Sequence, residues 1–386
     1  MNKQYYFDHA ASSFPKPDNV ISAMSDFMQN IAISPGHSSH SLAKKSSQVV
    51  TEAKETIARF FGIKNIHQLI FTLNATYAIN MVLQGFLKAA DHVIYTSTEH
   101  NSVLRCLNLL TENKNISLSC IPCNSDGMLD LPMIESSITP NTKLIVVNHA
   151  SNVTGIINPI EKIISIAKKH SIKVAIDAVQ TAGFINIDVE QLGCDYLFFT
   201  GHKALLGPTG IGGAYIKDID SVDSIIVGGT GGNSAALFHP ISMPEKFEPG
   251  TMHAINIAGL AAAIHYIDQI GLNSIREHQV GLTQFFLENL RKIKGVLIYG
   301  EQCAEIKTPV VSFNCNGFLA SEIAGLLDVK YGILVRSGLQ CAPLIHKALH
   351  SFPNGTIRVS FGYSNTYEEV EYLIRCLRCL ESRDEI

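Results

Sequence analysis

The sequence predicts an α/β protein with a large, doubly wound, mostly parallel sheet and a smaller α+β domain. Between residues 69 and 217 short apolar runs alternate with helical stretches, the pattern of strand–helix–strand units. The runs are continuously apolar, which is typical of strands covered on both faces. A passage rich in Gly and Pro, from Gly228 to Gly250, then separates this region from a different pattern. In such a sheet a ligand binds at the carboxyl ends of the strands.

The strands of the large domain are expected at the apolar runs, and helices between them. The expected strands are Leu69–Thr72, His92–Ser97, Ser117–Pro122, Lys143–Ala150, Lys173–Val179, Tyr196–Gly201 and Gly210–Lys217. The expected helices include Thr76–Ala89, Asn101–Asn113 and Pro159–His170.

The smaller domain is expected to begin with two helical stretches and to end on a helix. The helices are Ala254–Ile270, Ile275–Lys292, Ala320–Val329 and Tyr367–Leu380, with strands at Val310–Cys315 and Ile357–Gly362. We predict a large domain over residues 16–248. Residues 1–15 are expected to join residues 249–386 in the small one.

Composition excludes several classes of function. The chain has 386 residues, 46% apolar and 17% charged, with a net charge of −4. No cluster of Lys and Arg marks a nucleic-acid surface. The start, Met1–Tyr6, lacks the apolar core of a signal peptide, and the stretch Ile255–Ile264 is too short to span a membrane. These features predict a cytoplasmic protein that binds neither nucleic acid nor membrane.

The nine cysteines follow no regular spacing, and their odd number indicates reduced thiols. Two pairs, Cys120/Cys123 and Cys376/Cys379, have the C-x-x-C form of zinc ligands. The pairs are far apart in the sequence, and each sits inside an apolar element. Small buried side chains are the favoured interpretation, and no metal is predicted.

Lys203 and Asp177 are the most informative residues. Each is expected at the end of a strand, and Gln180 follows Asp177 by three positions. A lysine at such a place can bind pyridoxal 5′-phosphate (PLP) as a Schiff base, while an acid keeps the pyridine nitrogen protonated. Gln180 would donate to the phenolate oxygen. Taken singly, a helix-capping Asp and a surface Lys are the simpler interpretations, but their combination favours PLP.

Other polar residues at strand ends supply the rest of a PLP site. Ala75 and Thr76 open a helix whose N-terminal N–H groups could bind the phosphate, although Thr there is also a common cap. Thr200 and His202 flank Lys203 closely enough to reach the same phosphate. His100 could stack on the pyridine ring and move protons at the substrate Cα; a capping role is the alternative.

Two residues of the small domain complete the candidate site. Cys341 lies on a loop bounded by Gly and Pro and is expected to be mobile and accessible, unlike the other eight cysteines. Arg336 and His346 would help to make its surroundings electropositive. Arg358 interrupts an apolar strand, where a guanidinium needs a partner. A substrate carboxylate is the favoured partner, and an internal salt bridge to a Glu is the alternative.

These segments, in this order and spacing, resemble the class V aminotransferase-fold PLP enzymes. The resemblance is closest to the group II cysteine desulfurases and selenocysteine lyases and spans nearly the whole chain. The matching stretches are Phe7-Asp8-His9-Ala10-Ala11, Asn74-Ala75-Thr76, Glu99-His100-Asn101, Ser151-Asn152-Val153-x-Gly155, Asp177-x-x-Gln180, Thr200-Gly201-His202-Lys203, Gly207-Pro208-Thr209-Gly210, Phe247-Glu248-x-Gly250-Thr251, Arg336-Ser337-Gly338-x-x-Cys341-Ala342 and Arg358-x-Ser360-x-x-x-x-Asn365-Thr366.

The resemblance implies PLP fold type I and further roles. Asn152 would contact the phenolate oxygen or the substrate carboxylate, and Ala10 and Ala11 would line the substrate pocket. Thr251 would reach the phosphate of the other subunit of a homodimer. Cys341 would take sulfur from L-cysteine as a persulfide and release L-alanine. A short cysteine loop of this kind usually needs a separate sulfur-acceptor protein.

The chain departs from the family pattern at three positions. Gln340 stands where His commonly precedes the nucleophile, and Tyr77 replaces a common Glu. His37 replaces the Arg of an Arg-Gly-x-His motif of which His40 persists; this motif bears on the substrate carboxylate or on partner contacts.

A cysteine desulfurase with Lys203, His100 and Cys341 as catalytic residues is therefore the favoured prediction. A selenocysteine lyase would use the same residues, so the sequence leaves sulfur and selenium open. A transaminase or β-lyase on the same scaffold is a further alternative, as is a non-catalytic scaffold protein of sulfur metabolism.

Overall fold

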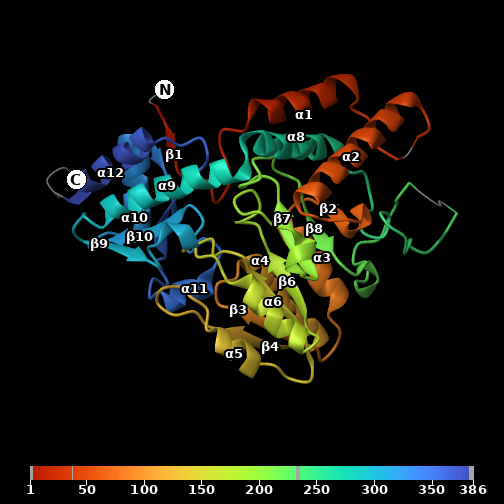
Figure 1. Cartoon of the computed structure of the whole chain (residues 1–386), viewed down its shortest axis with the longest axis horizontal. Helices are drawn as coiled ribbons and strands as arrows, with labels where there is room; N and C mark the ends of the chain where they lie inside the picture. The colour runs from red at the N-terminus through yellow and green to blue at the C-terminus, as the bar shows by residue number, and fades with distance from the viewer. Residues whose placement is uncertain (1–2, 37, 232–234, 382–386) are drawn as a thin grey trace.

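The computed structural model describes residues 3–36, 38–231 and 235–381. Two units lie side by side, a large one built around a seven-stranded sheet and a smaller one that holds both ends of the chain (Figure 1). No helix within these three ranges is long and apolar enough to cross a membrane.

The central sheet of the large unit has the order β2-β8-β7-β6-β5-β3-β4. Its strands are β2 (Leu69–Thr72), β3 (His92–Thr96), β4 (Ser117–Ile121), β5 (Thr142–Asn148), β6 (Lys173–Asp177), β7 (Tyr196–Thr200) and β8 (Gly212–Ile216). The five strands from β7 to β4 are parallel to their neighbours. The prediction of a mostly parallel α/β sheet is confirmed, except that β8 runs opposite to both β2 and β7.

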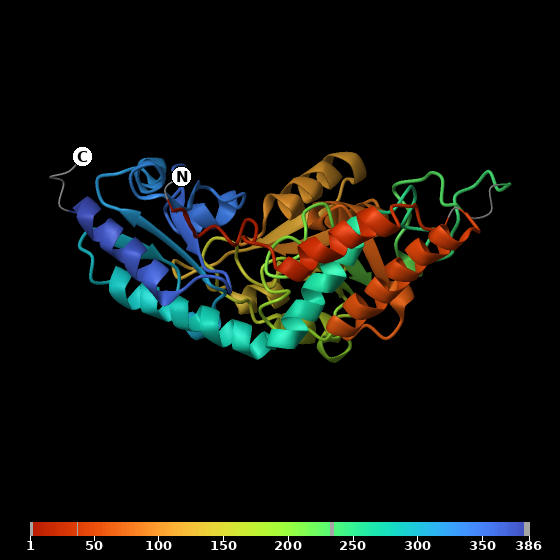
Figure 2. The same cartoon turned by 90° about the horizontal axis from the view of Figure 1, so that it is seen from above.

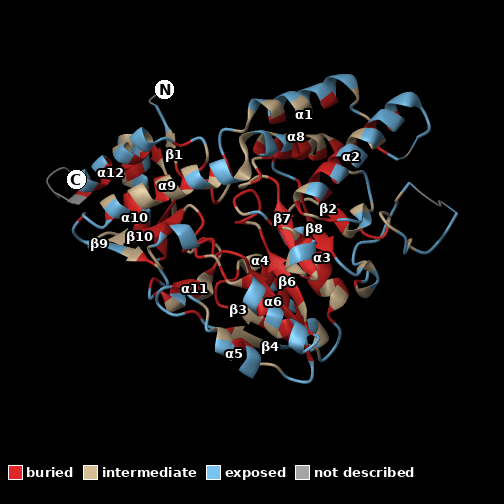
Figure 3. Ribbon diagram, in the orientation of Figure 1, coloured by how far each residue is buried: buried red, intermediate tan, exposed pale blue. Residues whose placement is uncertain are grey.

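Continuous apolar runs form these strands because both faces of the sheet are covered. In β6, Val174 and Ile176 belong to one hydrophobic core and Ala175, between them, to the other. The first core packs the sheet against α2 (Ser41–Phe60), α6 (Ile160–Lys169) and α8 (Ala254–Ile270). The second packs it against α3 (Ala75–Phe86) and α4 (Asn101–Lys114). Buried residues accordingly concentrate in the strands and the helix faces that cover them (Figure 3).

The smaller unit is a four-stranded antiparallel sheet of order β12-β13-β10-β9 with helices packed on it. The strands are β9 (Val296–Tyr299), β10 (Val310–Cys315), β12 (Arg336–Gly338) and β13 (Thr356–Ser360). The helices are α9 (Leu272–Leu290), α10 (Ala320–Tyr331), α11 (Pro343–Ala348) and α12 (Tyr367–Glu381). The N-terminal strand β1 (Tyr5–Tyr6) pairs with β11 (Ile333–Leu334), and Phe7 enters the core of this unit.

Helix α8 packs against the large unit rather than the small one. It lies along α2 and α1 (Asp18–Asn30), as Figure 2 shows, and Ile257, Leu260 and Ile264 belong to the large core. The sequence-based division into residues 16–248 and residues 1–15 with 249–386 stays a prediction, and this packing argues for a boundary after α8. Short helices α5 (Leu131–Ser136) and α7 (Val189–Leu192) complete the large unit.

Candidate active site

A cavity of about 260 Å³ lies at the carboxyl ends of the parallel strands. Asp177 is the last residue of β6, Thr200 is the last of the neighbouring strand β7, and Lys203 follows in the next turn. Parallel strands bring such residues to one edge of the sheet. The cavity is lined by Asn74, Ala75, Thr76, His100, Ser102, Asn148, Ala150, Asn152, Asp177, Val179, Gln180, Thr200, His202 and Lys203.

Burial and mutual attraction set the charges of Lys203 and Asp177. Burial lowers the pKa of the Lys203 amine to about 8, although the Asp177 carboxylate opposes this shift. Burial raises the pKa of Asp177, while the Val179 N–H and the Lys203 ammonium act against the rise. Lys203 can therefore become a neutral nucleophile near neutral pH, and Asp177 has a cation to face in the same cavity.

The lowered pKa of Lys203 predicts the pH at which added PLP becomes attached. Only the unprotonated amine attacks an aldehyde, and a lowered pKa makes this form abundant at lower pH. The rate of attachment to cofactor-free protein should rise with pH through a midpoint near 8. Stopped-flow absorbance between pH 6 and 10 measures it, and a midpoint near 10 would contradict this electrostatic environment.

The side of the cavity next to α3 fits a phosphate group. Asn74 caps α3 by accepting from the Tyr77 N–H, and Ala75 and Thr76 form its first turn. Thr200 Oγ1 and His202 Nδ1 are both buried and have no hydrogen-bond partner among the described residues. Buried polar atoms without a partner are costly, so they indicate a ligand that accepts or donates there. A helix N-terminus supplies the matching positive potential.

His100 caps α4 and also faces the cavity. Its Nδ1 accepts from the Ser102 N–H, so the proton of the neutral ring sits on Nε2. Burial, followed by the positive charges of Lys203 and Arg336, lowers the pKa of His100 to about 4. The residue therefore has both roles that the sequence suggested, since it caps a helix and presents a neutral imidazole to the cavity.

Asn152 and Gln180 each use an amide N–H in a hydrogen bond within the protein. Asn152 Nδ2 donates to the Gln340 carbonyl at 2.6 Å, and its buried Oδ1 has no described partner. Gln180 Nε2 donates to the Ala10 carbonyl at 3.1 Å. Both side chains line the cavity, so each would have to exchange or share its donor to reach a phenolate oxygen.

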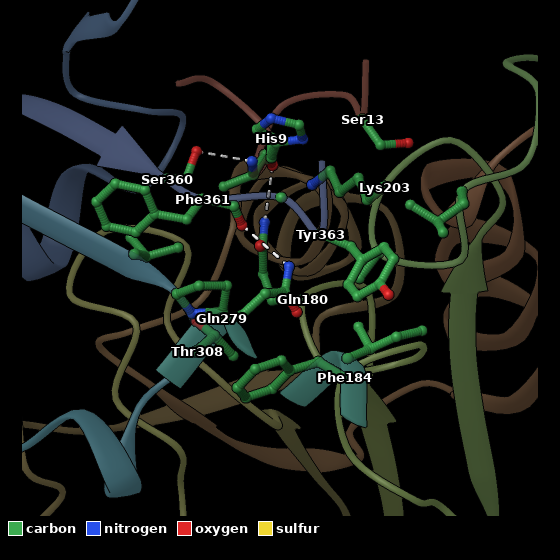
Figure 4. Close-up of a pocket in the computed structure, with 17 residues that line it drawn as sticks. His9, Ser13, Gln180, Phe184, Lys203, Gln279, Thr308, Ser360, Phe361 and Tyr363 are labelled. Atoms are coloured by element: carbon green, nitrogen blue, oxygen red, sulfur yellow. Dashed lines mark hydrogen bonds between the residues drawn. The ribbon is translucent and has the colours of Figure 1, made fainter. Parts of the chain in front are cut away.

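Lys203 and Gln180 also border a smaller cavity of about 30 Å³ between the two units. Figure 4 shows Lys203 close to Ser13 and His9 at the top of this cavity, with Gln279 and Phe184 below. Ala10, a predicted substrate-pocket residue, lines this smaller cavity and is tied by its N–H to Ser360 Oγ at 2.9 Å.

Arg358 is held by the N-terminal segment. Its side chain is 1% exposed, Nη2 donates to Asp8 Oδ1 at 2.6 Å, and Nη1 donates to the Asn152 carbonyl at 3.0 Å. The internal salt bridge is therefore real, but with Asp8 rather than a Glu. Arg358 Nε is buried without a described partner, which leaves a donor for a substrate carboxylate.

Replacing Arg358 by Lys should weaken substrate binding. Lys keeps the charge but cannot hold Asp8, the Asn152 carbonyl and a carboxylate together. We expect kcat/KM for L-cysteine to fall about 100-fold, mostly through a higher KM. Losing a well-oriented, charge-assisted hydrogen bond to the substrate has an effect of this size. Steady-state kinetics measure it. An unchanged KM with lowered thermal stability would mean that Arg358 serves Asp8 alone.

Cys341 lies in the turn between β12 and α11, and its backbone is tied at two points. Asn101 N–H donates to the Cys341 carbonyl at 2.7 Å, and Asn152 donates to the preceding carbonyl of Gln340. Gln340 and Cys341 both have positive φ, +43° and +61°, which non-glycine residues adopt only when their surroundings hold them. In this conformation the loop is anchored at both residues, and its mobility stays a prediction.

Arg336 and Gln340 define the surroundings of the thiol. Arg336 Nη2 lies 3.4 Å from Cys341 Sγ, which confirms the expected positive neighbour. His346 bonds to Gln340 Oε1 at 2.9 Å and to Ser351 instead. The Gln340 side chain is 2% exposed and donates to the Thr356 carbonyl, so it anchors the loop.

Two expectations about the other cysteines are wrong. Cys341 is half-buried, whereas Cys303 and Cys379 are exposed, so Cys341 is not the most accessible thiol. The C-x-x-C pairs are not uniformly buried, since Cys379 is exposed and Cys120 is half-buried. None of the nine cysteines forms a disulfide, and among the described residues no three His, Cys, Asp or Glu side chains gather as metal ligands.

Some predicted site residues lie elsewhere in this chain. Thr251 borders a separate apolar cavity of about 250 Å³ with Tyr77 and Ile226. His40 is exposed and caps α2 by accepting from the Ala43 N–H. Ala11 is half-buried next to Ala10, and His37 lies outside the described residues. Neither Thr251 nor His40 lines the cavity that contains Lys203. If they contact such a cavity, it would have to be that of a second subunit.

Two residues of the site were missed in the sequence. Asn148 ends β5 and lines the cavity. A polar residue near the end of the expected strand Lys143–Ala150 could have indicated this position. Asp8, the partner of Arg358, stands in the matched stretch Phe7–Ala11. Nothing local links it to a residue 350 positions away.

The geometry agrees with what comparisons with known proteins show. The family profile described as Aminotransferase class-V matches residues 5–373, nearly the entire chain. The chain belongs to the class V aminotransferase family. A protein named probable cysteine desulfurase from Halalkalibacterium halodurans is 33% identical over 96% of this chain and 92% of its own length. A cysteine desulfurase from Shigella flexneri is 32% identical over 97% of this chain and 92% of its own length.

Solved structures of proteins named cysteine desulfurase share the whole fold. A cysteine desulfurase from Thermococcus onnurineus has a TM-score of 0.91 and 33% identity, covering 99% of this chain and 96% of its own. A cysteine desulfurase from Escherichia coli, solved with an S-sulfonic acid, has a TM-score of 0.86 and 26% identity over 98% and 95% of the two chains.

Proposed function

We propose that this class V aminotransferase is a PLP-dependent cysteine desulfurase. It would convert L-cysteine to L-alanine and hold the sulfur as a persulfide on Cys341. One observation carries the proposal: Asn152 lines the cavity with Lys203 and Asp177, and it is bonded both to Arg358 and to the Gln340 carbonyl in the loop of Cys341. A carboxylate-binding group, a nucleophilic amine and a thiol beside Arg336 are the groups that this reaction needs.

The cavity residues fit PLP. Lys203 would attach the cofactor, Asp177 would pair with its ring nitrogen, and His100 would stack on the ring. Ala75, Thr76, Thr200 and His202 would hold the phosphate, while Asn152 and Gln180 would lie near the phenolate oxygen. When bound, PLP withdraws electrons from the substrate Cα and so makes its proton acidic.

The protein side chains would divide the remaining work. Arg358 binds the substrate carboxylate through its free Nε, and Ala10 and Ala11 border the substrate. Lys203 or His100 moves the proton at Cα. Cys341 Sγ attacks the substrate sulfur, the Cβ–S bond breaks, and Cβ takes a proton, so that alanine leaves and the sulfur stays on Cys341. Arg336 stabilises negative charge on the thiol during this attack.

A homodimer and a sulfur-acceptor protein are part of the proposal. Thr251 and Tyr77 border the apolar cavity of about 250 Å³, and the adjacent segment exposes Val227, Leu237 and Phe238. These exposed apolar side chains support a subunit contact, through which Thr251 and His40 would reach the cavity of the partner that contains Lys203. Because the Cys341 thiol is half-buried, an acceptor protein would have to dock beside it to receive the sulfur. A cytoplasmic location stays a prediction, supported by the odd number and irregular spacing of the nine cysteines.

The test is alanine release from L-cysteine and L-selenocysteine, side by side, with and without reductant. We expect alanine from L-cysteine, with strong stimulation by a reductant that clears Cys341. Alanine from L-selenocysteine alone would instead make the protein a selenocysteine lyase. Pyruvate and ammonia would support a β-lyase, and no visible absorption band after addition of PLP would refute the proposal.

A further inference from the structure

The carbonyl oxygen of His202, the residue before Lys203, accepts an unusual number of hydrogen bonds. The Ser13 N–H lies at 2.8 Å, the Lys16 ammonium at 3.0 Å, the Ser13 hydroxyl at 3.1 Å and the Ser12 hydroxyl at 3.4 Å. A carbonyl oxygen has two lone pairs, so four donors compete for them. The charged donor, Lys16, makes the strongest kind of bond in this set.

Lys16 has no acidic partner among the described residues. Its ammonium donates to Ser13 Oγ at 2.7 Å and to the His202 carbonyl, two neutral acceptors. Burial lowers the pKa of this amine to about 8, and its charge helps to lower the pKa of the neighbouring His202 ring. A partly buried cation without a counter-ion is costly, which argues for a role at the place that it faces.

The segment that carries Lys16 touches the site along its whole length. Asp8 holds Arg358, the Ala10 N–H binds Ser360 Oγ, and the Ala10 carbonyl accepts from Gln180. Ser13 and Lys16 then reach the turn that bears Lys203. Residues 8–16 therefore connect the candidate carboxylate-binding residue to the candidate cofactor lysine.

We propose that Lys16 is a positioning residue for Lys203, an inference that rests on the proposed function. The His202 carbonyl and the Lys203 N–H belong to one planar peptide group. Fixing that oxygen fixes the plane from which the Lys203 side chain projects. On the other side of the turn, Leu206 N–H donates to the Lys203 carbonyl and Gly207 N–H to the Gly201 carbonyl. Lys16 thus completes the support of the turn from the side of the N-terminal segment.

The test is Lys16→Met, which keeps the apolar stem and removes the charged donor. Lys162→Met, at an exposed lysine on α6, is the matched control, and Lys16→Arg restores a cation. We expect kcat for alanine formation to fall about 10-fold in Lys16→Met, with KM changed less than about twofold because Arg358 is untouched. The circular dichroism of the visible cofactor band should weaken, and Lys16→Arg should recover part of both signals.

Each result decides the role of Lys16. Unchanged kcat and an unchanged visible band in Lys16→Met would overturn it, and so would lowered thermal stability with both signals intact. If Lys16→Met does not fold, Ser13→Ala decides instead. That variant removes the hydroxyl shared by Lys16 and His202, and it should lower kcat by about threefold. If the protein without substitutions shows no visible cofactor band, the proposed function is refuted. If Lys16→Met shows the same band as that protein, only the role of Lys16 is refuted.

Discussion

Replacement of Cys341 by Ser should reduce alanine and sulfide formation from L-cysteine by at least about 100-fold, since the hydroxyl is a far weaker nucleophile toward sulfur. The change is nearly isosteric, and the loop is held through the main-chain carbonyls of Gln340 and Cys341. The positive φ at both residues should therefore persist. Cofactor absorbance should remain unchanged, because Cys341 is not among the residues that line the cavity with Lys203.

Cys303→Ser is the control for the Cys341 variant. Cys303 is exposed, so its loss tests whether any accessible thiol can relay the sulfur. Alanine formation should be unaffected in this variant, and mass spectrometry after reaction with L-cysteine should find the added sulfur on Cys341. Turnover that survives Cys341→Ser would remove the desulfurase proposal and favour a transaminase or β-lyase on the same scaffold.

Replacement of Lys203 by Ala should abolish covalent cofactor attachment and lower turnover about 1000-fold or more, as for loss of a residue that acts as both anchor and proton carrier. Lys203 is half-buried in the cavity that Asp177 also lines, and no other lysine lines this cavity of about 260 Å³ in the described part of the chain. Borohydride reduction followed by peptide mapping measures attachment. Reducible attachment in Lys203→Ala would contradict the assignment of the site.

Lys307→Met is the matched control for the Lys203 variant. Lys307 is buried, and burial lowers the pKa of its amine to about 8, the same value as for Lys203. Its ammonium donates to the Glu301 carbonyl, and Lys307 does not line the cavity that contains Asp177. A buried lysine with a lowered pKa is therefore not sufficient for the proposed role. Covalent attachment should be intact in Lys307→Met, even where thermal stability falls through loss of the buried hydrogen bond.

The strands of the large sheet were predictable because their pattern is local. The predicted run Leu69–Thr72 coincides with β2, and Lys173–Val179 contains β6, with Asp177 at its end. Burial on both faces produces such runs, and repeated strand–helix units bring their carboxyl ends to one edge. The position of Lys203 beside Asp177 followed from this topology.

Helices α1 and α2, and the packing of α8 on the large unit, were not predicted from the sequence. Helix α2 contains the polar run Lys44–Gln48, and its buried face is defined by contact with the distant helix α8. Helix α8 is apolar around most of its surface because it is covered by the sheet, α1 and α2. The pattern of its sequence does not say which unit covers it.

The chain's own sequence determined the α/β class, the order of the strands along the chain and the residue types at their ends, because periodicity and turn chemistry are properties of neighbouring residues. The tertiary structure alone decided which distant groups meet: Asp8 with Arg358, Asn152 with Gln340, and Lys16 with the carbonyl before Lys203. Such contacts join segments up to 350 positions apart. They depend on how the two units pack, and no local pattern records that packing.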